Sequence, residues 1–445
     1  MSKPKTRRQK AIIRRRIFLS LCGIFLAAAI ALTVFIVKSI TNLTDADNNS
    51  SNTQSTASKE EKPIEKYATV LSTGDIMVHS TQLDGAKVDF GDGYDFSAFF
   101  KECKPYFNNY DVNVANLEVT FGGTESGKYN GYPAFNTPDS LADVIKESGL
   151  NFLVTANNHS YDTGMFGLQR TAQILKQKGI EFIGTRETEG EPIYTVKDVN
   201  GIKIGMANFT YSSMTDDRKN LNGNVLKAEA GNLVSTFNYY DLESFYAEAQ
   251  ATITDMKLGG AEFIVFYMHW GNEYQLEPNT WQKTIAQKLS NLGVDIIIGS
   301  HPHVIQPVEL IHSEDGQNTT VCIYSTGNAI SNQRQELMDS CPSGHTEDGM
   351  FFTYTLKKVG DEVTLVDLDI IPTWVNKYKG GSGYQYTIYP LETADAGSVV
   401  YGLNSTAANK AAKSYERTKA LVKDGLTACQ QNIGCEITFQ DTVTE

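Results

Sequence analysis

Histidines, carboxylates and amides recur directly after short apolar runs of this sequence. The sharpest case is residues 299–303, where His301 and His303 flank a proline. Two imidazoles held one residue apart can be presented to one or two metal ions. In residues 156–164, two asparagines precede His159 and Asp162. Because an amide oxygen can bind a hard cation and an imidazole can donate a proton, this segment suggests acid–base chemistry beside a metal.

Three more strand tips, meaning the polar segments that directly follow an apolar run, each carry a single candidate ligand. Asp75, Glu118 and His269 each follow an apolar run. Taken alone, the aspartate could cap a turn, the glutamate could face solvent and the histidine could be structural. Taken together, nitrogen and oxygen ligands on successive tips suit a borderline divalent metal. We therefore expect one or two ions of Mn, Zn or Fe.

The apolar runs alternate with stretches in which apolar residues recur every three or four positions. These stretches include residues 140–148, 167–178, 241–257 and 280–292. Strands that alternate with helices predict an α/β fold with helices covering a central sheet. Ligands of such sheets bind beyond the carboxyl ends of the strands, which is where the candidate residues fall.

Charge and hydropathy divide the 445-residue chain unevenly. Its net charge is −13, but residues 1–16 hold eight cations and no acid, so the rest carries −21. An acidic body of this kind excludes nucleic acid as a partner. Residues 17–37 are uncharged and apolar, and as a helix they would span about 31 Å, the thickness of a bilayer core. The preceding cations place the N-terminus in the cytoplasm and the main domain outside the cell.

Two alternatives to this anchor are a cleaved signal peptide and a buried core helix. The apolar run is longer than a usual signal peptide and lacks a small-x-small cleavage site. We therefore predict a single-pass protein of the cell membrane. Its segments are a basic tail (1–16), a transmembrane anchor (17–37), a flexible linker (38–65), a main domain (66–335) and a C-terminal extension (336–445) that completes the sheet and ends in a helix.

The cysteines do not indicate a disulfide framework. An odd number remains outside the anchor, and none forms a C-x-x-C pair. Cys429 and Cys435 are close enough in sequence to pair outside the cell, and whether they form a disulfide stays open.

The order of the tips resembles a known family. The motifs are Gly74-Asp75-Ile76-Met77, Asn116-Leu117-Glu118, Asn157-Asn158-His159, His269-Trp270-Gly271 and Ser300-His301-Pro302-His303. In this order they resemble the CapA/PgsA family of capsule-synthesis proteins, associated with poly-γ-glutamate, a branch of the calcineurin-like metallophosphoesterase superfamily. The resemblance implies a four-layer α/β/β/α sandwich with a two-metal site at the strand ends.

The resemblance also implies roles for individual residues. The metal ligands would be Asp75, Glu118, Asn158, His269, His301 and His303. His159 would donate the proton. From the residues at the strand tips, and not from the resemblance, we expect Asp162 to be the other catalytic residue and Asn116, Trp270, Glu273 and Asn328 to bind the substrate. Two positions depart from the superfamily pattern: Met77 stands where a histidine ligand is usual, and Glu118 replaces a bridging aspartate.

Two functions follow from this interpretation. The first is a metal-dependent hydrolase or transferase that acts outside the cell on a capsule polymer or a cell-wall component. The second is a non-catalytic, metal-binding assembly or export factor beside the subunits of a membrane-bound polymer synthase. The acidity of the body disfavours tight binding of a polyanionic polymer unless metal neutralises the contact.

Overall fold

The structure of the protein is a computed structural model that describes residues 64–88, 93–381 and 383–439. Contacts divide the chain into residues 1–62 and residues 63–445, and the second unit is described below. The predicted tail, anchor and almost all of the linker lie outside the described residues. Within the described ranges, no helix has the length and apolar character needed to cross a bilayer.

The first sheet places the N-terminal strand at its centre. Its order is β18-β17-β16-β1-β2-β3-β4, and β15 also pairs with β1. Strand β1 runs parallel to β2 and antiparallel to β16, which comes from the far end of the chain. The strands are β1 (Glu65–Ile76), β2 (Val112–Leu117), β3 (Phe152–Val154), β4 (Glu181–Ile183), β15 (Asn328–Ile330), β16 (Asp348–Val359), β17 (Glu362–Lys379) and β18 (Tyr384–Pro390).

The second sheet is largely parallel, in the order β10-β6-β11-β12-β14-β13, with β5 paired to β6. Its strands are β5 (Tyr194–Val199), β6 (Ile202–Tyr211), β10 (Thr236–Phe237), β11 (Phe263–His269), β12 (Ile296–Ser300), β13 (Val308–His312) and β14 (Thr319–Ile323). A small third sheet consists of β7 (Ser213–Thr215), β8 (Arg218–Leu221) and β9 (Asn224–Val225).

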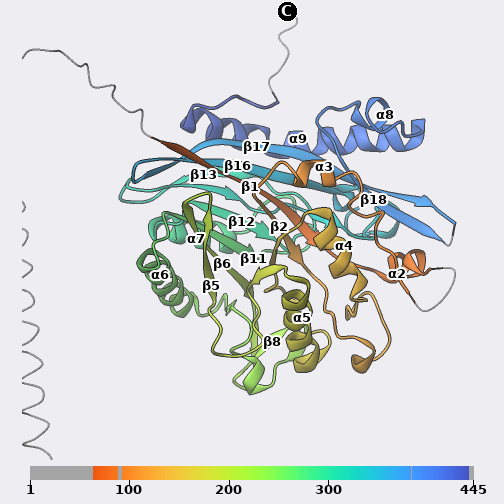
Figure 1. The fold of residues 1–445 in the computed structure, drawn as a ribbon, viewed down its shortest axis with the longest axis horizontal. Coiled ribbons are helices and arrows are strands. Elements are labelled where there is room, and N and C mark those ends of the chain that lie inside the picture. The colour runs from red at the N-terminus through yellow and green to blue at the C-terminus, as the bar shows by residue number, and fades with distance from the viewer. Residues whose placement is uncertain (1–63, 89–92, 382, 440–445) are drawn as a thin grey trace, which may run out of the picture. The chain divides into compact units, whose positions relative to one another are not determined.

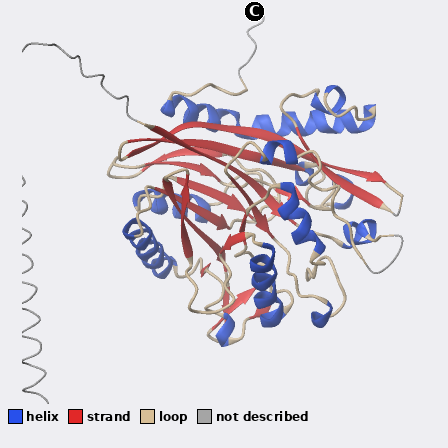
Figure 2. Ribbon diagram, viewed as in Figure 1, coloured by secondary structure: helices blue, strands red, loops and turns tan. Residues whose placement is uncertain are grey.

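The two large sheets pack face to face, and helices cover their outer faces (Figures 1 and 2). Val70 of β1 and Val265 of β11 belong to one buried cluster between the sheets. Helices α4 (Ser140–Ser148) and α5 (Gly164–Lys178) bury their apolar side chains on the first sheet. Helices α6 (Leu242–Leu258) and α7 (Thr280–Asn291) do the same on the second.

A long C-terminal helix, α9 (Ser405–Ile433), packs on β17 and β13, so it contacts a strand of each sheet. Its residues Val422, Leu426 and Cys429 enter the cluster between the sheets. The remaining helical segments are short. They are α2 (Ser80–Ala86), α3 (Lys104–Phe107), α8 (Ala396–Val399) and the 3-10 turns η1 (Thr124–Ser126), η2 (Ala228–Ala230), η3 (Gln335–Leu337) and η4 (His345–Glu347).

The prediction of an α/β fold is confirmed. The apolar–polar periodicity alone indicated one central sheet, whereas the chain forms two large sheets. Both are buried on both faces, so their strands look alike in sequence. Cys429 is buried and Cys435 is partly exposed, and both are free thiols in the structure.

Candidate functional site

The carboxyl ends of strands from both large sheets converge on one buried cluster of polar side chains. Asp75 lies at the end of β1, and Glu118 directly follows β2. His269 ends β11, while His301 and His303 follow β12. All five side chains are buried. The strand-tip residues singled out in the sequence are therefore brought together from two sheets.

Glu118 occupies the middle of this cluster. Its Oε1 lies 3.7 Å from Nε2 of His269 and 3.7 Å from Nε2 of His303. The same oxygen is buried and has no hydrogen-bond partner in the described chain. Burial, followed by the charge of Asp75, raises the pKa of Glu118 well above its usual value. A buried acceptor without a donor costs about 1–3 kcal/mol, so the fold maintains this oxygen at a cost in stability.

Asn116 holds the two carboxylates in place. Its Nδ2 donates to Asp75 Oδ1 at 2.8 Å and to Glu118 Oε2 at 3.0 Å. Its Oδ1 accepts from Asn157 Nδ2 at 3.1 Å. Asp75 Oδ2 in turn lies 2.9 Å from His303 Nδ1. The structure thus places Asn116 behind the candidate ligands, where it orients them.

The rings of His269 and His301 are fixed by different contacts. His269 Nε2 lies 2.8 Å from Asn158 Oδ1, and its Nδ1 lies 2.8 Å from Ser300 Oγ. Tyr211 stacks on His269, and its ring also contacts that of His301. His301 Nδ1 is buried without a partner among the described residues. Burial lowers the pKa of both histidines well below the usual value, which favours the neutral imidazole that binds metals.

The backbone of the His-Pro-His segment is strained. His301 has a φ of 97° and His303 a φ of 58°. Left-handed conformations of residues other than glycine cost on the order of 1–3 kcal/mol and persist where the surroundings enforce them. In this segment, the two residues with left-handed backbones are the ones whose imidazoles lie near Glu118.

These residues fit a divalent metal. Ligand atoms of Glu118, His301 and His303 all lie within 4.8 Å of one another, and so do those of Asp75, Glu118 and His269. The two groups share Glu118, whose Oε1 lacks a donor, and carboxylates mixed with imidazoles suit Mn, Zn or Fe. Met77, at the position where a histidine was expected, is buried and cannot supply a nitrogen.

His159 and Asp162 form a pair at the edge of this cluster. His159 Nδ1 lies 2.7 Å from Asp162 Oδ2, which also accepts the backbone N–H of Phe135 at 2.7 Å. The Phe135 ring packs edge-on against the imidazole, with 4.8 Å between ring centroids. Because the carboxylate accepts the Nδ1 proton, Nε2 is the nitrogen left for exchange with a ligand.

A cavity of about 460 Å³ opens beside the cluster. It is lined by Met77, His79, Tyr132, Phe135, His159, Glu273, Tyr274, His303, Asn332, Gln333, Leu337, Met338 and Ser340. Of the four residues expected to bind substrate, the structure places only Glu273 on this lining, where it is exposed.

The other expected substrate-binding residues lie elsewhere. Trp270 is fully buried in the outer core of the second sheet, and its Nε1 donates to Tyr324 O at 2.9 Å. Asn328 Nδ2 donates to backbone oxygens of His303 and Thr346, so it braces two segments of the chain. Both side chains are engaged inside the protein and do not line the cavity.

Several residues that contact the candidate ligands or His159 had been given no role from the sequence. Ser300 directly precedes the His-Pro-His segment and Tyr211 ends β6, so both had a signal in their position at a strand end. Phe135 lies in an irregular segment and had none.

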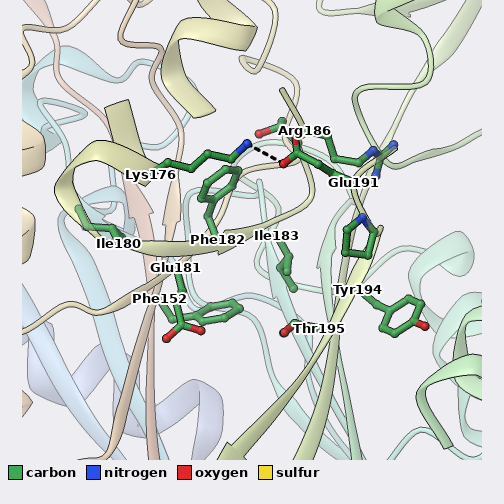
Figure 3. A pocket seen from close by; sticks show the side chains of 12 residues that line it. Phe152, Lys176, Ile180, Glu181, Phe182, Ile183, Arg186, Glu191, Tyr194 and Thr195 are labelled. Carbon is green, nitrogen blue, oxygen red and sulfur yellow. Dashed lines mark ion pairs between the residues drawn. The ribbon is translucent and has the colours of Figure 1, made fainter. Parts of the chain in front are cut away.

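A second cavity, of about 320 Å³, lies between α5, β4 and β5 (Figure 3). Apolar side chains such as Phe152 and Ile183 line it, with an ion pair of 2.8 Å between Lys176 and Glu191. No residue of the two metal-ligand groups contributes to it. Of these two cavities, only the first therefore borders the metal-ligand groups, through His303.

Comparisons with known proteins agree with the motifs. The family described as "Bacterial capsule synthesis protein PGA_cap" matches residues 69–333, more than half of the chain. "Capsule biosynthesis protein CapA" of Bacillus anthracis is 26% identical over 325 residues, 72% of this chain and 70% of that protein. "PGA biosynthesis protein CapA" of Bacillus subtilis is 30% identical over 279 residues, 61% of this chain and 65% of that protein.

Solved structures resemble the chain more distantly. A phosphatase of Mycoplasma pneumoniae is 12% identical with a TM-score of 0.40, over 69% of this chain and 94% of that one. A calcineurin-like phosphoesterase of Bacillus subtilis is 17% identical with a TM-score of 0.37, over 80% of this chain and 98% of that one.

Proposed function

Because the chain belongs to the family of bacterial capsule synthesis proteins, PGA_cap, we propose that it acts in the synthesis or export of a capsule polymer such as poly-γ-glutamate. In this proposal it is a membrane-anchored protein whose main domain lies outside the cell. Its strand-end cluster is a metal-dependent site of the hydrolase or transferase type, in a metallophosphoesterase-like four-layer sandwich. The order helix, sheet, sheet, helix supports that assignment.

The observation that carries the proposal is the unsatisfied Glu118 Oε1 between two imidazole nitrogens. A cation held there would coordinate the oxygen and offset the free-energy cost of burying the carboxylate. The residues that would hold one or two ions are Asp75, Glu118, Asn158, His269, His301 and His303. A bound Mn, Zn or Fe ion supplies Lewis-acid polarisation of a substrate oxygen and a more acidic water.

The protein's own residues would handle the proton. His159 lines the cavity, and Asp162 accepts its Nδ1 proton and fixes the ring. The imidazole would then give the proton on Nε2 to the leaving group as the bond to it breaks. Asn116 would keep both carboxylates turned toward the metal, and Tyr211 would exclude water from the faces of His269 and His301.

The first experiment measures metal content and turnover together. The full chain, purified in mild detergent without chelators, is compared with a His301→Ala/His303→Ala variant by elemental analysis. We expect one to two equivalents of a transition metal in the wild type and less than about 0.2 in the variant. His312→Ala is the matched control, because His312 is exposed on β13 and bonded to Thr319. Equal metal content in all three proteins would refute the metal site.

Turnover is then followed with poly-γ-glutamate and with bis(p-nitrophenyl) phosphate. The two substrates separate amide from phosphodiester chemistry. We expect hydrolysis or transfer of one of them by the wild type and its loss in the His301→Ala/His303→Ala variant. In cells, capsule yield and polymer length should change with the same variant.

One observation favours the second candidate, a non-catalytic assembly or export factor. The described residues that line the cavity include no lysine or arginine, and Glu273 adds a negative charge. A polyanion would therefore meet no cation there except a metal. The wild type could bind metal and turn over neither substrate. If deletion of the protein still abolishes capsule assembly in that case, the assembly role replaces the enzymatic one.

A further inference from the structure

A histidine outside the metal-ligand groups reaches the same cavity. His79 lies between the end of β1 and the start of α2, is partly exposed, and lines the cavity together with His159 and His303. The structure places it in neither of the ligand groups.

The ring of His79 is held through Nδ1. The backbone N–H of Asn332 donates to this nitrogen at 3.2 Å. Gln82 Oε1 also lies near, at 3.3 Å from Nδ1, but it already accepts the backbone N–H of His79 at 2.8 Å. A backbone amide can only donate, so the contact with Asn332 favours Nδ1 as the acceptor and the ring proton on Nε2.

Nε2 makes no hydrogen bond to any described residue, yet it is not sealed from solvent. Because the exposed part of the ring belongs to the cavity lining, this N–H is available to a bound molecule. Burial lowers the pKa of His79 to about 4, so the ring stays neutral at physiological pH.

Phe135 contacts both His79 and His159. The Phe135 ring packs edge-on against both imidazoles, with centroid distances of 5.3 Å to His79 and 4.8 Å to His159. The two histidines differ in what supports Nδ1: a backbone N–H for His79 and the Asp162 carboxylate for His159. A carboxylate stabilises the imidazolium form and supports proton transfer, whereas a backbone donor opposes it.

We propose that His79 is a substrate-binding residue that donates its Nε2–H to an oxygen atom of the group bound in the cavity. The inference rests on the proposed function for the location of the substrate and deepens it by naming a neutral donor. The acceptor is a phosphoryl or acyl oxygen, since both are strong acceptors that a neutral N–H can bind. Because Gln333 Nε2 is bonded to Tyr274 and the described lining carries no lysine or arginine, His79 adds a neutral donor to the cavity.

The test uses two substitutions of different reach. His79→Asn keeps a side chain that can accept from Asn332 and cap α2, but it is too short to bring a donor into the cavity. His79→Gln restores a longer amide donor. His312→Asn is the control for losing an imidazole at an exposed site.

Binding is measured by calorimetry on the full, Mn²⁺-loaded chain in detergent, with orthophosphate and γ-glutamylglutamate as separate probes. We expect at least one probe to bind, with Kd about tenfold weaker in His79→Asn and within about threefold of the wild type in His79→Gln and His312→Asn. The probe that responds identifies the phosphoryl or the acyl acceptor. Equal affinity in wild type and His79→Asn, or no binding of either probe to the wild type, would overturn the proposal.

A spectroscopic readout separates binding from a purely structural role. In ¹⁵N-histidine spectra we expect His79 to carry its proton on Nε2, and the Nε2–H signal to shift when the responding probe is added. A proton on Nδ1 would also overturn the inference. Because His79 lies outside the ligand groups, metal content should be unchanged in both His79 variants. Loss of metal or turnover in the His301→Ala/His303→Ala variant therefore tests the proposed function separately.

Discussion

At the scale of single residues, the site is kept at a cost to stability. Glu118 is a buried carboxylate whose Oε1 has no donor. His301 and His303 hold left-handed backbone conformations. Each feature is unfavourable alone, and in the proposed function a cation bound among these side chains would offset that cost.

Glu118→Gln should therefore separate stability from metal binding. The amide removes an ionisable group whose burial is unfavourable, so in EDTA the free energy of unfolding should rise by roughly 1–3 kcal/mol. Metal content without chelators should fall, because the amide is a weaker ligand. Urea unfolding and elemental analysis measure the two effects.

Glu347→Gln is the matched control for this variant. Glu347 is also buried, but it pairs with Arg334 at 2.7 Å and accepts from Trp374 Nε1 at 3.1 Å. Its replacement should lower stability in EDTA. A loss of stability in Glu118→Gln as well would show that the carboxylate is satisfied without a metal.

Asp162→Asn tests the proton-transfer pair. The amide keeps an acceptor for Phe135 but no longer stabilises the charged imidazole of His159. If the site is catalytic, turnover of the responsive substrate should fall about 10²- to 10⁴-fold with metal content unchanged. Asp139→Asn, in a part-buried pair with Arg170, should leave turnover intact. Full activity in Asp162→Asn would remove His159 from the proton-transfer role.

At the scale of elements, close backbone contacts fix how the parts dock. Gly425 lies in the middle of α9, and a Cβ built there would stand 1.7 Å from the backbone oxygen of Val308 in β13. The helix therefore crosses the strand where only a glycine fits.

Gly425→Ala should consequently destabilise the protein although alanine is the better helix former. Helix propensity alone favours alanine by about 1 kcal/mol. The clash with a strand backbone should outweigh this gain and lower the free energy of unfolding by roughly 1–3 kcal/mol. Gly397→Ala in α8, where the new methyl would lie 3.0 Å from the Ala411 side chain, should cost less. Denaturant unfolding of both variants decides the sign.

Asp295, which lies away from the site, should make the free energy of unfolding depend on pH. It precedes β12, its Oδ2 accepts from Ile264 N at 2.7 Å, and burial raises its pKa to about 6. The folded state thus holds the proton more tightly than the unfolded state, so the ionised carboxylate lowers stability as pH rises from about 4 to about 6. Asp295→Asn should match the wild type near pH 4 and exceed it by roughly 1–3 kcal/mol at pH 7. Unfolding at both pH values measures this difference, and a constant difference would contradict it.

The sequence predicted where strands lie along the chain better than which strands pair with each other. Apolar runs followed by polar tips located β1, β2, β11 and β12 and most of the cluster, because ligands gather at the carboxyl ends of parallel strands. Nothing local indicated that β16 would pair with β1, since long-range pairing is not encoded in periodicity.

The same limit explains the residues at the cavity. Trp270 followed a strand like the true cluster members, but its indole turns into the outer core. Phe135 lies in an irregular segment, and only the tertiary fold brings its ring into contact with both His79 and His159. A side chain's direction at a strand end depends on packing that a single sequence does not reveal.

At the scale of the whole molecule, charge sets the conditions for meeting a polyanion. The chain beyond residue 16 carries −21. If it binds poly-γ-glutamate, divalent metal must bridge like charges, and monovalent salt must screen the repulsion between them.

Affinity for poly-γ-glutamate should therefore stay constant or increase between 50 and about 300 mM NaCl, and EDTA should abolish it. Sedimentation or fluorescence anisotropy with labelled polymer measures both effects. Polylysine of matched length should show the opposite salt dependence. A steep loss of affinity for the polyanion with salt would instead indicate a basic binding surface.

The central position of β1 has a consequence for the timing of assembly. Glu65 pairs with Val359 and Ser72 with Phe352, so nearly three hundred residues separate the two strands. A chain emerging from its N-terminus has Asp75 and its β2 neighbours early, but it lacks the other strands beside β1 until β15 and β16 have been made. The sheet that carries the ligand cluster is thus completed only late in the chain, and contacts of such separation fold slowly. A newly made chain would gain its affinity for metal only on reaching the complete fold, so metal uptake would mark a finished molecule.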